Sequence, residues 1–148
     1  MTKRLLVPVD GSDPADAALN FTLEEYPDAD ITALSVVDPT DVGYGSMDAA
    51  PSTFDHLQRT VEERTEAVLE AARETAAEQD IELTTETVIG IPSRAIVEYV
   101  QENDVDHVVM GSHGRQGVSR LLLGSVAENV VRRSPVPVTV ARNDTDDE

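Results

Sequence analysis

A regular alternation between two apolar patterns constrains this chain more than any other feature. Short apolar runs of strand length alternate with longer segments in which apolar residues recur every three or four positions. Such alternation favours right-handed crossovers and parallel strand pairing. We predict an α/β fold with an open, doubly wound, five-stranded parallel sheet in the order 3-2-1-4-5 and four helices. The predicted strands are residues 4–9, 30–37, 81–89, 106–110 and 136–140, and the predicted helices are 13–26, 53–79, 92–103 and 124–133.

Local signals set the ends and faces of these elements. Asp13 before Pro14 predicts a helix start, because Asp can cap and proline at the first helical position loses no hydrogen bond. Segment 38–52 has two prolines, two glycines and almost no periodicity, so we expect a long loop that is functional or mobile. The long helix after it carries one apolar stripe, with Glu and Arg opposite, made of Phe54, Leu57, Val61, Val68, Ala72 and Ala76.

The last predicted strand begins with two prolines, Pro135 and Pro137. Both lack an N–H and, being two residues apart, face the same neighbour, so this strand belongs at an edge of the sheet. Two interpretations stand equally. The edge, from Val138 to Arg142, pairs with a second copy in a homodimer, or the prolines simply protect it from aggregation.

Length and charge limit the classes of function. The 148 residues fit one domain, predicted as residues 1–142 with an acidic tail at 143–148. The net charge of −18 disfavours nucleic acid as a partner. No Cys is present and the three His are dispersed, so no metal site is expected. No apolar run or signal core points to a membrane, so we expect a cytoplasmic protein.

The acidic residues are spread along most of the chain rather than gathered in one block. Lys3 is the only lysine. Molar salt shortens the Debye length to about 3 Å and screens the repulsion among such charges. The pattern therefore suggests a protein from the salt-rich cytoplasm of a halophilic archaeon.

Glycines cluster after the fourth predicted strand, where four of the eight glycines fall between Gly111 and Gly124. Ligands of open α/β sheets bind beyond the carboxyl ends of strands, and glycine lets the backbone approach them. Gly124 and Ser125 open a helix whose first N–H groups attract an anion, and Arg115 and Arg120 add positive charge. This pattern favours a phosphate site over a structural turn with a serine-capped helix.

Three common phosphate sites are excluded by their required residues. A P-loop needs Gly-Lys-Ser/Thr, and the only lysine is Lys3. A dinucleotide fingerprint should follow the first strand, where the chain has Val-Asp-Gly-Ser-Asp-Pro instead. A receiver domain needs an acidic residue at the end of the third strand, which here ends in Val-Ile-Gly.

The remaining pattern resembles the universal stress protein family over nearly the whole chain, apart from the loop after the second strand. The spacing Gly111-x2-Gly114-x9-Gly124-Ser125 is similar to that family's nucleotide motif. The segments Leu-Leu-Val-Pro-Val-Asp-Gly-Ser, Ala-Leu-Ser-Val-Val-Asp and Ser-Pro-Val-Pro-Val resemble its first, second and last strands. The resemblance implies ATP binding, because family members with the full motif bind ATP.

The resemblance also implies which residues hold the nucleotide. Asp10 would lie near the ribose and base, the backbone of Val36 would face the adenine, and residues 125–127 would meet the phosphates, with Mg2+ able to bridge them. The full implied set is Pro8, Asp10, Val36, Met110, Gly111, Ser112, His113, Gly114, Arg115, Gln116, Gly117, Gly124, Ser125, Val126 and Ala127.

Efficient catalysis is not expected. Phosphoryl transfer needs a positioned water, a base and charge stabilisation, and the glycine-rich loop offers only His113, Arg115 and Arg120. The leading interpretation is a nucleotide-gated stress-response module that binds ATP. The alternatives are a structural or protein-interaction member of the family that uses no nucleotide, and a slow ATPase.

Overall fold

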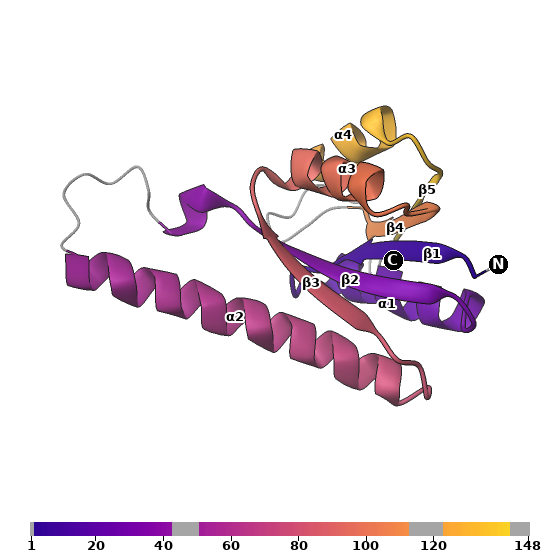
Figure 1. Cartoon of the computed structure of the whole chain (residues 1–148), viewed down its shortest axis with the longest axis horizontal. Helices are drawn as coiled ribbons and strands as arrows, with labels where there is room; N and C mark the ends of the chain where they lie inside the picture. Colours follow the sequence, from indigo (N-terminus) through magenta and orange to yellow (C-terminus); the bar gives the residue numbers. More distant parts are fainter. Residues whose placement is uncertain (1, 43–50, 113–122, 143–148) are drawn as a thin grey trace, which may run out of the picture.

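The chain folds around one parallel sheet with the strand order β3-β2-β1-β4-β5 (Figure 1). The computed structural model describes residues 2–42, 51–112 and 123–142. The predicted fold class, strand order and four α-helices are confirmed. The strands are β1 (Arg4–Pro8), β2 (Asp30–Val37), β3 (Thr84–Ile89), β4 (His107–Gly111) and β5 (Val138–Ala141), and the helices are α1 (Asp13–Glu25), η1 (Pro39–Val42, a 3-10 turn), α2 (Pro51–Ala77), α3 (Pro92–Glu102) and α4 (Ser125–Arg133).

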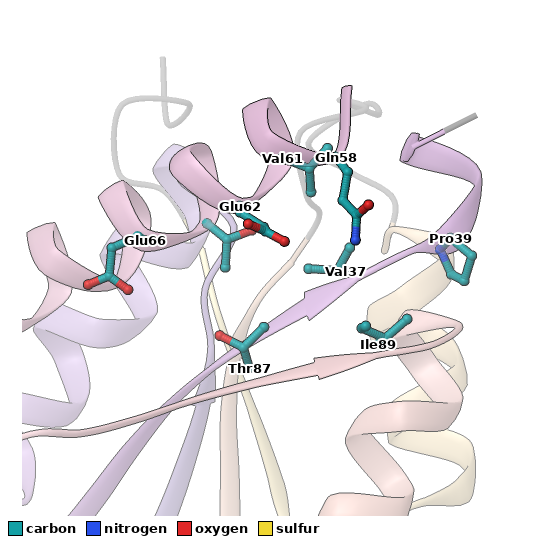
Figure 2. A pocket seen from close by; sticks show the side chains of 9 residues that line it. Val37, Pro39, Gln58, Val61, Glu62, Glu66, Thr87 and Ile89 are labelled. Atoms are coloured by element: carbon teal, nitrogen blue, oxygen red, sulfur yellow. The ribbon is translucent and has the colours of Figure 1, made fainter. Parts of the chain in front are cut away.

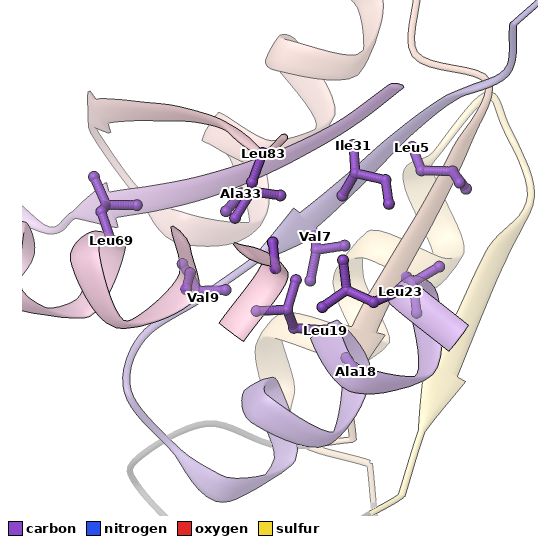
Figure 3. Close-up of a cluster of buried hydrophobic side chains, with 13 residues drawn as sticks. Leu5, Val7, Val9, Ala18, Leu19, Leu23, Ile31, Ala33, Leu69 and Leu83 are labelled. Carbon is purple, nitrogen blue, oxygen red and sulfur yellow. The ribbon is translucent and has the colours of Figure 1, made fainter. Parts of the chain in front are cut away.

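Helices cover both faces of the sheet, so its three central strands, β2, β1 and β4, are buried from two sides as a doubly wound fold requires. Helices α1 and α2 lie on one face, and α3 and α4 lie on the other (Figure 1). Alternate β1 side chains serve the two layers, because Leu5 and Val7 pack toward α1 and α2 while Leu6 packs toward α3 and α4. Figure 3 shows the first of these clusters, in which Leu19 and Leu23 of α1 meet β1.

Several predicted element bounds were wrong, each for a local reason. Strand β3 begins at Thr84, not at residue 81, because the Ile81 N–H donates to the Ala76 carbonyl (3.0 Å) and closes the end of α2. Strand β5 begins at Val138. Pro137 has no N–H to donate, and its carbonyl accepts a hydrogen bond from the Val108 N–H (3.0 Å). The predicted loop 38–52 is shortened at both ends by η1 and by the first turn of α2.

The predicted stripe on α2 is correct from Val61 onward. Val61, Ala72 and Ala76 are buried, but Leu57 is 38% exposed and the buried Leu69 was missed. The side chain of Phe54 and the predicted tail 143–148 lie outside what the structure describes. Within the described residues, no helix is long and apolar enough to cross a membrane. Residues 56–60 of α2 are exposed, whereas Val61, Leu69, Ala72 and Ala76 of its later turns are buried.

Strand β5 lies at an edge of the sheet, as its prolines predicted. It pairs with β4 alone, and all four of its residues are partly exposed. His107 of β4 joins the two strands, because its Nε2 lies 2.8 Å from the Thr139 hydroxyl. The His107 ring also meets Tyr26 edge to face, with centroids 5.9 Å apart. A neutral imidazole is suited to this half-buried position.

We expect His107 to make the fold acid-sensitive. Burial and then the charge of Lys3 lower the pKa of His107 below its usual value. Its stabilising contribution is therefore complete above about pH 6.5 and is lost as the pH falls below that value. Thermal unfolding between pH 8 and pH 5 should show a larger loss of Tm for the wild type than for His107→Gln. The same Tm loss in both proteins would contradict this, and His56→Gln serves as the control.

Candidate functional site

The order of the strands reverses between β1 and β4, and this places a crevice at their carboxyl ends. From β1 the chain proceeds outward to β2 and β3, whereas β4 and β5 extend the other side of the sheet. The register pairs of β1 with β4 end at Leu6 and Val108, before either strand ends. Such a switch point is where open α/β sheets bind their ligands.

Pro8 explains why these two strands stop pairing there. The next residue, Val9, donates its N–H to the Leu34 carbonyl of β2 (2.9 Å). Since successive residues of a strand point their N–H groups to opposite sides, Pro8 faces β4, where it has no N–H to give. The predicted site residue Pro8 thus helps to open the crevice between β1 and β4.

Asp10 follows β1 and shapes the turn into α1. Its Oδ1 accepts hydrogen bonds from the Ser12 N–H (3.0 Å) and the Ser12 hydroxyl. Ser12, and not Asp13 as predicted, is the cap of α1, since its hydroxyl accepts from the Ala15 N–H (3.3 Å). Gly11 between them has a φ of +82°, which glycine adopts without strain. One carboxylate oxygen of Asp10 is therefore structural, and Oδ2 has no partner among the described residues.

The end of β4 packs tightly against the start of α1. The side chain of the predicted site residue Met110 is buried in the cluster beneath α3 and α4. A Cβ on Gly111 would lie 2.6 Å from the carbonyl carbon of Pro14. Packing therefore requires glycine at position 111. The sequence analysis had explained the glycine cluster by ligand binding alone. Ser112 is buried, and its N–H donates to the Ala141 carbonyl (3.1 Å).

The helix α4 begins directly beside β4. The Gly124 N–H donates to the Ser112 carbonyl (2.8 Å), which joins the two ends of the glycine-rich segment. Gly124 is the cap residue and no side-chain hydrogen bond caps the helix, so the alternative of a serine-capped helix was wrong. The first N–H groups of α4, on Ser125, Val126 and Ala127, have no acceptor within the helix and carry its positive dipole end. The predicted residues His113, Gly114, Arg115, Gln116 and Gly117, and also Arg120, lie outside the described part of the chain.

Asp10 and Val36 line one small hollow of about 40 Å³, as expected of two residues at neighbouring strand ends. Its other wall comes from α2, which contributes Arg64 and Val68 among others. The sequence interpretation missed Arg64 because it assigned every arginine of this helix to the solvent side. The signal was available, since Arg64 lies three residues after Val61 and four before Val68, on the same face.

The charges around the crevice are mixed. Burial, and then the carboxylates of Asp13 and Asp10, raise the pKa of Asp16 in the first turn of α1. An anionic ligand near Asp10 would meet these carboxylates, and Arg64 is the cation that lines the same hollow as Asp10. The positive end of α4 is therefore the better place for the charged part of such a ligand. Among the described residues, no group of three or more acidic or His side chains is arranged to hold a metal ion.

The chain as a whole is similar to proteins of one family. A family model described as the universal stress protein family matches residues 1–142. A universal stress protein of Methanocaldococcus jannaschii is 33% identical over 145 residues, which cover 95% of this chain and 82% of that protein.

Solved structures agree with this match. The structure of the Methanocaldococcus jannaschii protein MJ0577 superposes with a TM-score of 0.80 at 28% identity and covers 96% of both chains. A universal stress protein solved in complex with cAMP superposes with a TM-score of 0.69 at 25% identity, covering 95% of this chain and 97% of that one. Both share the fold described above over almost its full length.

Proposed function

This chain belongs to the universal stress protein family, and on that premise we propose that it binds an adenine nucleotide, ATP first among them. The nucleotide would lie at the carboxyl ends of β1, β2 and β4, with its phosphates at the start of α4. Binding would gate the interaction of the protein with a partner in the stress response. The relative solved with cAMP supports an adenine nucleotide as the class of ligand.

One observation carries the proposal. The hydrogen bond from the Gly124 N–H to the Ser112 carbonyl sets the uncapped start of α4 beside the crevice where the strand order reverses. A nucleoside between Asp10 and Val36 would then direct its phosphates toward the N–H groups of α4. Both ends of the ligand thus meet suitable groups, the base at a strand end and the anion at a positive helix end.

Mg2+ fits this arrangement only as a companion of the phosphates. The described residues offer no cage of carboxylates, and Mg2+ commonly keeps several water ligands while bridging phosphate oxygens. Arg64 would supply a further positive charge near the nucleoside. We place the protein in the cytoplasm of a high-salt organism, a proposal supported by its net charge of −18.

We propose a homodimer formed through the edge strand, from Val138 to Arg142. The support is that β5 pairs on one side only and that its residues are half-exposed. Pro137 lacks an N–H and Pro135 precedes it, so the pairing would be confined to the residues after them. Sedimentation of the full chain measures this, and a monomer at micromolar concentration would rule it out.

Calorimetric titration with ATP, AMP and cAMP tests the proposed function. We expect a saturable signal with at least ATP. In about 2 M KCl the affinity should equal or exceed that in about 0.15 M KCl, because screening weakens the repulsion from the acidic body more than it weakens contacts to backbone N–H groups. If no nucleotide binds at either salt concentration, the chain is instead a structural or protein-interaction member of its family.

A further inference from the structure

A second, larger hollow of about 230 Å³ lies between α2 and the ends of β2 and β3 (Figure 2). Its apolar lining comes from two strands, from the turn after β2 and from α2. These side chains are Val37, Pro39, Val61 and Ile89. Ile89 is 71% exposed, an unusual state for an isoleucine at the end of a strand beneath a helix.

The groove exists because α2 covers the edge strand incompletely. On the face of β3 that is turned to α2, Thr85 is held by a hydrogen bond from the Arg73 guanidinium (2.7 Å), whereas Thr87 and Ile89 remain exposed. Leu57 in the early part of α2 is likewise 38% exposed. The apolar surface near the groove therefore has no partner among the described residues.

Two carboxylates border this apolar surface, and they differ in their surroundings. Glu66 is bound by the Arg73 guanidinium, so its charge is compensated. Glu62 makes no ion pair with any described cation. Figure 2 shows the Glu62 carboxylate directed from α2 across the groove, near Gln58 and Val37. The groove therefore has an apolar wall and, beside it, the Glu62 carboxylate, which has no ion-pair partner among the described residues.

We propose that this groove is a binding site for a compact organic cation, one with an ammonium or guanidinium head and a small apolar body. The head would pair with Glu62 and donate to Gln58 or Thr87, and the body would cover Val37 and Ile89. The groove, of about 230 Å³, has room for a small ligand of this kind.

The preference for a cation is limited to this groove and does not extend to the smaller hollow lined by Asp10 and Val36. That hollow is lined by Arg64 as well as by Asp10, so its charges are mixed, and it shares Val37, Val61 and Thr65 with the groove. Helix α2 therefore presents a positive side chain to one hollow and a negative one to the other. The cation site does not depend on the proposed nucleotide site, and the following experiment contains no nucleotide.

Three probes of similar shape test the proposal: cyclohexylammonium, cyclohexanol and cyclohexanecarboxylate, each titrated into the nucleotide-free full chain and followed by NMR. We expect the cation to bind with a Kd on the order of 1 mM and to shift the amides of Thr87, Ile89 and Val61. The alcohol should bind several-fold more weakly, since it lacks the charge, and the carboxylate should not bind.

Two matched variants sharpen the test. Glu62→Gln should weaken binding of the cation roughly five- to tenfold, whereas Glu63→Gln, the same change one residue along α2, should leave it unchanged. Thr87→Phe should fill the groove and abolish binding. The proposal is overturned if the three probes bind equally, if both Gln variants weaken the cation alike, or if the shifted amides lie elsewhere.

Discussion

Gly124→Asp should reduce the affinity for ATP on the order of 100-fold or more while the fold remains intact. Gly124 is the cap of α4, with φ −68° and ψ 160°, a conformation open to any residue. Asp is among the best helix caps, so the substitution should preserve or increase Tm. Its carboxylate would, however, lie where the phosphates are proposed to bind. Two like charges about 4 Å apart repel by about 4 kcal/mol near a protein surface.

Gly124→Asn is the matched control, because it has nearly the same shape and capping ability without the charge. We expect this variant to keep its affinity for ATP within a few-fold of the wild type. Calorimetric titration measures affinity, and thermal unfolding of the same samples reports stability. If Asp and Asn weaken ATP equally, the effect is steric, and if neither weakens it, the phosphates do not lie at the start of α4.

Gly111→Ala should destabilise the whole fold. The added Cβ would lie 2.6 Å from the Pro14 carbonyl carbon and 2.8 Å from its oxygen, and backbone atoms cannot turn aside as a side chain can. Either β4 or the start of α1 must move. Overpacking of this kind costs about 1–3 kcal/mol. For a chain of this size that corresponds to a fall in Tm of roughly 3–10 °C, measured by thermal unfolding.

The neighbouring change Met110→Leu serves as control for that experiment. It conserves volume at a position that is 5% exposed, so the free energy of unfolding should change by less than about 1.5 kcal/mol. An unchanged Tm for Gly111→Ala would mean that the approach of β4 to Pro14 is not tight in solution. Gly111 would then be explained by the ligand alone.

The elements of the fold were predictable because each depends on local patterns. Alternating apolar runs of strand and helix spacing predicted five strands and four helices in a doubly wound sheet. The errors fall at the ends of elements, where single hydrogen bonds between residues close in the chain decide. Ile81 looks like a strand residue, yet its N–H closes α2. Asp13 looks like a cap, yet Ser12 performs that role, with its hydroxyl held by Asp10.

The candidate site was predictable in part. The strand ends with Asp10 and Val36 and the helix start at Ser125 followed from the motif and from the family that it resembles. Arg64 did not, because a long helix has exposed arginines on several sides and only its angle to the sheet decides which one reaches a site. The groove beside Glu62 was equally unpredictable, since it depends on how far α2 stands from β3.

The sequence by itself determined the doubly wound fold and the edge position of β5. These follow from periodicity, missing N–H groups and parallel connections, all properties of short segments. Only the tertiary structure decided that Gly111 is needed beside Pro14, that Arg64 lines the same hollow as Asp10, and that a groove opens beside Ile89. Each of these depends on the distance between elements far apart in the chain, and side-chain packing sets that distance.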